Sequence, residues 1–244
     1  RLETKDVRAD ESLQNVEKLL FGNFEEVFHL DPAGHETHVR RRWNVIGSGA
    51  AHKQYFKEFD RILIELFNNP DLDAQPKFVA DMGSGDGTLL AHIWEVVKTK
   101  TLRGQHLNTH PLFIVGADLF EKSRQETLKT LVKAGIDDPL IVEANIVDPA
   151  GYAQTLERLH VFQREGIGAD DGLHVRSFLD HNRPYLGVTD RAAATARVST
   201  STGTFVGPNG EAIPNEELEQ NLFEHLAGWN PLIRKHGLLM IELH

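Results

Sequence analysis

The chain has 244 residues, of which 40% are hydrophobic and 25% charged, with no cysteine and a formal net charge of −10 at pH 7. This composition is ordinary for a soluble globular protein and leaves room for one large α/β domain with an appendage. It excludes disulfides, thiolate metal sites and cysteine nucleophiles, and the acidic balance argues against a nucleic-acid partner. No apolar run is long enough to cross a membrane and no signal peptide is visible, so we expect a cytoplasmic protein without a membrane partner.

The N-terminal part, residues 1–70, is predicted to be a helical lid over a core formed by residues 71–244. Apolar residues at helical spacing predict a short helix around residues 13–20 and a longer one around 55–66, ended by Pro70. The three arginines at 40–42 are either an exposed basic turn or a contact for an acidic substrate carrier. The aromatic residues Trp43, Tyr55 and Tyr185 either line a substrate pocket or lie in the core.

From Lys77 onward, predicted strands alternate with predicted helices. This alternation indicates α/β: a Rossmann-like, doubly wound, mostly parallel sheet. Residues 188–214, rich in Thr, Ser, Ala and Gly, are too long for an ordinary connection and are expected to be an insertion or mobile loop. The strands are expected at 78–80, 112–117, 139–143, 171–178 and 237–243, and the helices at 88–97, 122–134, 149–162 and 216–234.

A glycine-rich turn, Asp81 to Gly87, lies between the first strand and the helix that follows it. Its spacing, GSGDG, matches neither the dinucleotide pattern GxGxxG nor a phosphate-binding loop ending in Lys-Ser/Thr. The turn contains two carboxylates, Asp81 and Asp86, which suit a ligand with cationic groups better than a pyrophosphate. S-Adenosylmethionine (SAM), with its ammonium and sulfonium, is such a ligand. The alternative is a tight turn without any ligand.

The sequence DMGSGDGT resembles motif I of the class I SAM-dependent methyltransferases, and with Asp118 and EANIVDP the resemblance covers about half of the chain. The resemblance implies that motif I, Asp118 and the EANIVDP segment at the end of the third strand all contact SAM. Asp118 would hold the ribose, or else cap a helix, whereas Asp148 is expected to be a helix cap. The family has strands beyond the fifth, which we expect to be absent from this chain. The expected SAM-binding residues are Asp81, Gly83, Ser84, Gly85, Asp118, Leu119, Asn145 and Ile146.

A second group of polar side chains follows the last two predicted strands. Asp180 and His181 come just after the fourth strand, and His244 ends the fifth. Ligands of open α/β sheets bind outside the carboxyl ends of the strands, so we expect these side chains to face the methyl donor. Two imidazoles that converge there can hold a divalent metal. Without a metal, His181 alone can act as a base.

The helical N-terminal segment, SFLDHNRPY and IELH resemble the metal-dependent C-methyltransferase domains of polyketide synthase loading modules, of the apratoxin type. The resemblance implies Fe(II), Mn(II) or Zn(II) held by His181 and His244. The third ligand is either Asp180, Glu242 or a residue beyond the chain. Asp180 would otherwise act as a base or as an orienting group.

The same resemblance implies methylation of the α-carbon of a malonyl-type group on an acyl carrier protein, with neighbouring megasynthase domains as further partners. A cation chelated by the 1,3-dicarbonyl unit would stabilise the enolate that carbon methylation requires. Two alternatives stay open. One is a metal-free O- or N-methyltransferase of a small molecule with His181 as base, and the other is an inactive methyltransferase domain kept as a scaffold.

Overall fold

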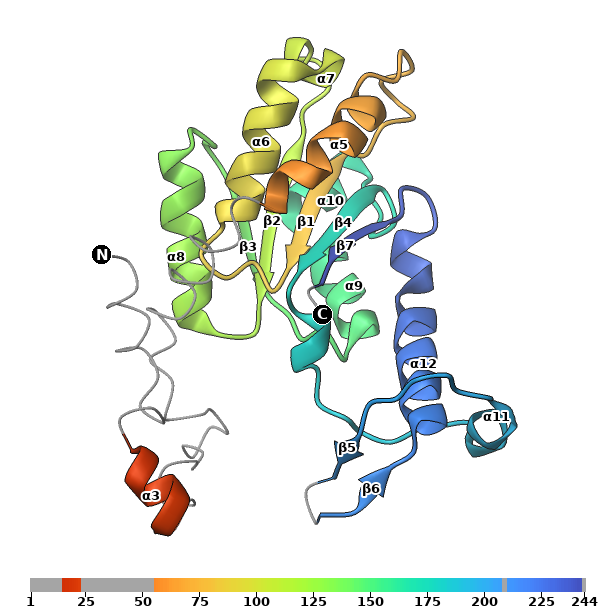
Figure 1. Cartoon of the computed structure of the whole chain (residues 1–244). Helices are drawn as coiled ribbons and strands as arrows, with labels where there is room; N and C mark the ends of the chain where they lie inside the picture. Colours follow the sequence, from red (N-terminus) through yellow and green to blue (C-terminus); the bar gives the residue numbers. More distant parts are fainter. Residues whose placement is uncertain (1–14, 23–54, 208–209, 243–244) are drawn as a thin grey trace. The chain divides into compact units, whose positions relative to one another are not determined.

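The computed structural model describes residues 15–22, 55–207 and 210–242 (Figure 1). The chain divides into two compact units, Arg1–Ala144 and Asn145–His244. Each unit is built on parallel strands connected by helices, and each is described by itself below.

The first unit contains three parallel strands in the order β3, β2, β1: β1 (Phe78–Met82), β2 (Phe113–Asp118) and β3 (Leu140–Glu143). All five residues of β1 are buried, as expected for a parallel strand covered on both faces. In the register of the β1–β2 pair, Asp81 lies beside Gly116 and Met82 beside Ala117. The strands of this unit therefore end at one edge, with Asp81 and Asp118 at or near their last positions.

Helices of the first unit cover this sheet. α6 follows β1 and buries five apolar residues, and α8 packs against β2 and β3. α5 lies against α6 in Figure 1, with Leu63 and Phe67 fully buried. Most of the predicted lid, residues 1–14 and 23–54, lies outside the described residues, so the division into lid and core stays a prediction. The helical segments are α3 (Val16–Phe21), η2 (Tyr55–Phe59), α5 (Asp60–Phe67), α6 (Thr88–Lys100), α7 (Leu102–Gln105) and α8 (Glu121–Lys133).

The second unit contains the parallel pair β4 and β7, in which Ser177 lies beside Ile241. The long helix α12 packs against β4 and α9, and the segment between β4 and α12 includes a short helix and a small antiparallel hairpin (Figure 1). The elements are α9 (Pro149–Glu157), α10 (His160–Glu165), β4 (Gly172–Ser177), η3 (Asp180–Asn182), α11 (Arg191–Ala196), β5 (Phe205–Val206), β6 (Ala212–Ile213), α12 (Asn215–Ile233) and β7 (Leu238–Ile241).

The predicted alternation of parallel strands and helices is confirmed, and the fold class is Rossmann-like α/β. One boundary prediction is wrong, because the helix expected at 149–162 is two helices separated at Leu159, whose backbone is extended. Leu156 and Phe162 are both fully buried. In one continuous helix they would point about 120° apart, so the break allows both side chains to reach the core. Residues 188–214 are more ordered than a plain loop, since they contain α11 and the hairpin.

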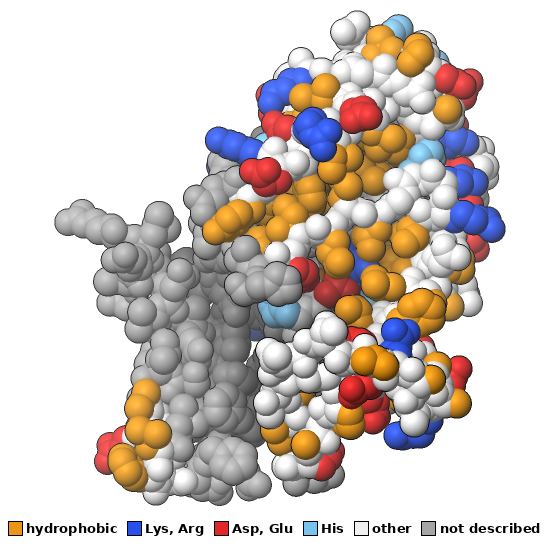
Figure 2. Space-filling view, turned by 45° about the vertical axis from the view of Figure 1, so that its right-hand side comes forward, with side chains coloured by type: hydrophobic (Ala, Val, Ile, Leu, Met, Phe, Trp, Pro, Cys, Tyr) orange, Lys and Arg blue, Asp and Glu red, His pale blue; other side chains and the backbone are white. Residues whose placement is uncertain are grey.

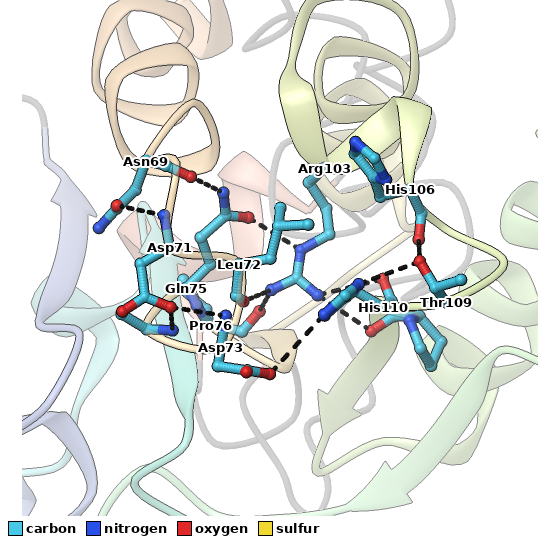
Figure 3. Close-up of polar contacts among 12 residues, drawn as sticks. Asn69, Asp71, Leu72, Asp73, Gln75, Pro76, Arg103, His106, Thr109 and His110 are labelled. Atoms are coloured by element: carbon cyan, nitrogen blue, oxygen red, sulfur yellow. Dashed lines mark hydrogen bonds and ion pairs between the residues drawn. The ribbon is translucent and has the colours of Figure 1, made fainter.

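A buried arginine connects the segments that lead into β1 and β2 (Figure 3). Arg103 is 2% exposed, and its Nε donates to Gln75 Oε1 at 2.8 Å. Its two terminal nitrogens donate to the carbonyl oxygens of Pro76 at 3.0 Å and of Leu72 and His110 at 3.1 Å each. One guanidinium therefore binds carbonyl groups in the segment before β1 and in the segment before β2. The sequence alone did not predict this role of Arg103.

Replacing Arg103 by methionine is expected to lower the free energy of unfolding by about 3–5 kcal/mol, because several buried acceptors lose their donor at once. Urea unfolding of both proteins measures this loss. The control is Arg164→Met, since Arg164 is 62% exposed and pairs only with its neighbour Glu165. A change within about 0.5 kcal/mol is expected there. Equal losses in the two variants would contradict the assigned role of Arg103.

No helix in the described part of the chain is long and apolar enough to span a membrane. On the face drawn in Figure 2, basic and acidic side chains of the described residues are interspersed and do not form a basic stripe. The expectation that nucleic acid is not a partner stays a prediction.

Candidate functional site

The turn after β1 has a backbone that favours glycine at three positions. Gly83, Gly85 and Gly87 all have positive φ, of 79°, 56° and 79°. Side chains other than glycine rarely adopt this conformation. At Gly87 there is also little space, because an added Cβ would lie 3.1 Å from the Cα of Thr127. The predicted glycine-rich turn is therefore present, and it leads into α6 at Thr88.

Hydrogen bonds hold this turn against the end of β2 and against α8. The N–H groups of Gly83 and Ser84 both donate to the carbonyl of Ala117, at 2.8 and 3.1 Å. The Ser84 hydroxyl is 2.9 Å from the hydroxyl of Thr127. The Gly85 N–H donates to Asp118 Oδ2 at 3.1 Å. The turn is thus rigid before any ligand binds, and the side chain of Ser84 is directed into the protein.

Asp81 is a buried carboxylate whose charge is poorly compensated. Its residue is 1% exposed, and Oδ1 has no hydrogen-bond partner in the described part of the chain. Burial raises the pKa of Asp81 well above its usual value, and the nearby charges of Asp118 and Asp86 raise it further. A cationic ligand would compensate this carboxylate. The unpartnered Oδ1 therefore fits the ammonium or sulfonium of SAM.

Asp118, at the end of β2, holds the glycine-rich turn and the start of the next segment through both of its carboxylate oxygens. Oδ2 accepts from Gly85 and Oδ1 accepts from the N–H of Phe120 at 2.9 Å. The N-cap position of α8 is Phe120, so Asp118 is not the cap that was the alternative. The ribose contact of Asp118 stays a prediction. Leu119 follows with its side chain 44% exposed.

In the second unit, the segment after β3 is fixed by two side chains. The Asn145 Oδ1 accepts from the N–H of Val147 at 3.2 Å. The buried Ile146 accepts through its carbonyl from the indole N–H of Trp229, at 3.1 Å. Asp148 caps α9 by accepting from the N–H of Gly151 at 2.9 Å, which confirms its predicted role. The SAM contacts of Asn145 and Ile146 stay predictions.

The chain leaves β4 through a strained residue. Phe178 has φ 54°, the one positive φ of a residue other than glycine in the described chain. Its N–H donates to the carbonyl of Ile241 at 2.8 Å, which ties it to β7. Such strain costs about 1–3 kcal/mol and is concentrated at functional sites. The turn that follows, η3, contains Asp180 and His181.

Glu242, just after β7, holds this turn with both of its oxygens. Oε1 accepts from the N–H groups of Leu179 and Asp180, at 2.9 and 2.7 Å. Oε2 is 2.7 Å from Nδ1 of His181. A carboxylate only accepts, so in the neutral imidazole Nδ1 would carry the proton and Nε2 the lone pair. The His181 side chain is 53% exposed, and in the described structure nothing is hydrogen-bonded to its Nε2. His181 is thus an imidazole oriented by Glu242, and its Nε2 makes no hydrogen bond to the described residues.

The carboxylate of Asp180 lies in a buried polar cluster with Arg176 and His225. Its Oδ1 lies 3.3 Å from Arg176 Nη1 and 3.3 Å from His225 Nε2, and the latter two atoms are 3.0 Å apart. The side chains of Arg176, Asp180 and His225 are 0%, 9% and 5% exposed. Burial acts to raise the pKa of Asp180, but His225 and Arg176 lower it by more. These contacts suit Asp180 to the role of an orienting group, one of the two roles proposed for it from the sequence.

The described residues supply one clear ligand atom for the predicted metal, Nε2 of His181. Both oxygens of Glu242 are used by other donors, and Asp180 faces Arg176 and His225. His244 lies outside the described residues. Within the described chain, no group of three or more His, Cys, Asp or Glu side chains is arranged to hold a metal ion. The described residues therefore fit His181 as a ligand and do not complete a metal site.

Comparison with known proteins identifies the family. A family model described as an AprA MT2-like domain matches residues 36–244, which is most of the chain. The chain belongs to this family. It is a methyltransferase domain with a Rossmann-like fold. No curated protein matches this AprA MT2-like domain.

Solved structures of other methyltransferases resemble this AprA MT2-like domain only distantly. Magnesium protoporphyrin IX methyltransferase from Synechocystis PCC 6803, solved with bound SAM, is 12% identical at a TM-score of 0.36, with 91% of this chain and 85% of that chain covered. An O-methyltransferase family protein from Burkholderia thailandensis is 15% identical at a TM-score of 0.33, with 56% of this chain covered. The match spans only 32% of the Burkholderia chain. The family match, not these structures, therefore identifies the domain.

Proposed function

We propose that this domain transfers the methyl group of SAM to the α-carbon of a malonyl-type acyl group on the acyl carrier protein of a polyketide synthase. The observation that carries the proposal is the His181–Glu242 pair, an imidazole with its tautomer fixed and its second nitrogen free. Such a base suits removal of a proton from a carbon between two carbonyl groups. The resemblance of SFLDHNRPY and IELH to polyketide synthase C-methyltransferases supports the same acceptor.

The proposed reaction needs two groups of this chain. His181 Nε2 takes the α-proton, and the electron pair of the broken C–H bond forms the enolate. The enolate carbon then bonds to the methyl carbon of SAM, while the methyl–sulfur bond breaks and its electron pair stays on sulfur, which gives S-adenosylhomocysteine. Glu242 stabilises the imidazolium that forms at His181. The glycine-rich turn with Asp81 and Asp118 holds the donor.

We keep a divalent metal, Fe(II), Mn(II) or Zn(II), as a second proposal, with His181 Nε2 and His244 as the residues that would hold it. The supporting observation is the carboxylate on Nδ1, because metal-bound histidines usually donate their other ring N–H to such a partner. When bound, the metal would stabilise the enolate as a Lewis acid. Turnover of malonyl-carrier protein with and without chelator tests this, together with metal analysis. Activity that chelation leaves unchanged would reject the metal.

Two other functions are separated by simple assays. A small-molecule O- or N-methyltransferase would methylate hydroxyl or amino acceptors and leave malonyl-carrier protein unchanged. An inactive scaffold domain would fail to bind SAM in calorimetry, against the expectation from the unpartnered carboxylate of Asp81. The carrier protein and neighbouring megasynthase domains are proposed partners, and the cytoplasmic location stays a prediction.

Replacing Glu242 by glutamine is expected to lower kcat about 10- to 100-fold with little change in KM. Glutamine can still accept from Leu179 and Asp180, but its amide nitrogen cannot accept from His181 Nδ1, so the ring loses its fixed tautomer. Steady-state kinetics measure this. The control is Glu165→Gln, a partly exposed glutamate that pairs with its neighbour Arg164. An unchanged kcat in the Glu242 variant would remove the pair from the proposed reaction.

A further inference from the structure

Arg183 follows the turn that contains His181, and among the described residues it makes no direct ion pair, although the charge of Asp180 acts on it. Its N–H closes the turn by donating to the carbonyl of Asp180 at 3.2 Å, and its backbone is extended ahead of Pro184. The residue is half-buried, and its Nε is buried without a hydrogen-bond partner. A guanidinium held in this way, two residues after the proposed base, is available to bind an anion.

The charged groups around Arg183 also favour the binding of an anion. Arg176, which is 0% exposed, also has two buried nitrogens, Nε and Nη2, without a hydrogen-bond partner. The carboxylate of Asp180 lies 3.3 Å from Arg176 and attracts Arg183 as well. Glu242, the other acid of this turn, already accepts from three donors. Asp180 attracts both guanidiniums, and Glu242 attracts Arg176 as well. Buried donors without a hydrogen-bond acceptor, here nitrogens of Arg176 and Arg183, usually indicate a ligand or water.

We propose that Arg183, with Arg176 behind it, binds an anionic group of the methyl acceptor. This inference rests on the proposed function, because it specifies the acceptor of the same site. A guanidinium binds carboxylate or phosphate through two parallel hydrogen bonds. The anion is either the free carboxylate of the malonyl group or the phosphate of the carrier's phosphopantetheine arm. Arg183 contacts it, and Arg176 supplies positive charge from the interior.

Four acceptor analogues distinguish these two anions: malonyl and 3-oxobutyryl thioesters, each of pantetheine and of phosphopantetheine. Their binding is measured by calorimetry on the full chain loaded with S-adenosylhomocysteine, so the result does not depend on turnover. If Arg183 binds the carboxylate, Arg183→Gln weakens both malonyl compounds about 10- to 100-fold and leaves both 3-oxobutyryl compounds unchanged. If it binds the phosphate, Arg183→Gln weakens both phosphopantetheine compounds by the same factor and leaves both pantetheine compounds unchanged.

Two variants separate recognition from folding. Arg183→Lys keeps the charge without the two-pronged geometry and is expected to recover part of the lost affinity. Arg191→Gln removes a 75% exposed arginine that pairs with Glu217 from the same unit, and no change is expected. A uniform loss on all four compounds, or no loss on any, would overturn the proposal. Failure of the wild-type chain to methylate malonyl-carrier protein, despite anion-selective binding through Arg183, would reject the proposed function alone.

Discussion

Replacing His181 by asparagine is expected to lower kcat for methyl transfer about 10²- to 10⁴-fold, the usual contribution of a general base. The amide nitrogen of asparagine takes the place of Nδ1 and still donates to Glu242, so the turn stays anchored. What is lost is Nε2, the free basic nitrogen. Single-turnover assays with enzyme saturated in SAM measure the chemical step, and calorimetry should show SAM affinity within about two-fold of wild type, because the change leaves the glycine-rich turn intact.

The matched control is His160→Asn, since His160 is an exposed histidine of the same unit with no described contact through its ring. Its kcat should equal that of wild type. Metal analysis of the two variants adds a second readout, because loss of bound metal only in the His181 variant would support the metal proposal. A His181→Asn enzyme with kcat within three-fold of wild type would exclude the histidine as base or ligand.

Replacing Asp81 by asparagine is expected to weaken SAM binding about 10- to 100-fold, because a charge-assisted contact to a cationic donor is lost. The same change should stabilise the ligand-free protein at neutral pH by about 1–3 kcal/mol, since a buried, unpartnered carboxylate is removed. Calorimetry and urea unfolding measure the two effects. The exposed Asp137, replaced in the same way, should change neither.

The pH dependence of the Asp81 effect has a defined sign. Burial raises the pKa of Asp81 in the folded state, so the folded protein binds this proton more tightly than the unfolded chain does. Its stabilising contribution is present below the unfolded pKa of about 3.9 and is lost as pH rises through the folded value. The advantage of the asparagine variant should therefore grow as pH rises above about 4. Wild-type SAM affinity should rise over the same window, with proton release on binding, and an equal pH profile in both proteins would contradict the role of Asp81.

The glycine-rich turn of the first unit could be predicted from the sequence because its determinants are local. A strand, a glycine-rich turn and a helix follow one another within residues 78–100, and positive φ at Gly83, Gly85 and Gly87 needs no distant partner. The cap at Asp148 was predictable for the same reason, since Pro149 and Gly151 are its neighbours. Both features depend only on residues that are close together in the sequence.

The turn after β4 in the second unit depends on contacts between distant residues, which a single sequence does not reveal. Glu242 holds residues 179–181 from across the β4–β7 pair, and His225 on α12 contacts Asp180. The sequence offered Glu242 only as one of several metal ligands and gave no role to His225. An available signal was Arg176, a charged residue inside a predicted strand, which must find a partner when buried. The helix break at Leu159 likewise follows from two core contacts and not from local propensity.

Transfer of a deuterated methyl group from SAM to malonyl-carrier protein tests the central claim most directly. The product is released from the carrier and its labelled atom is located by mass spectrometry and NMR. The account predicts a CD₃ group bonded to the α-carbon of the acyl chain, in an amount equal to the S-adenosylhomocysteine formed. Label on an oxygen or nitrogen atom, or no transfer by an enzyme that binds SAM, would contradict it.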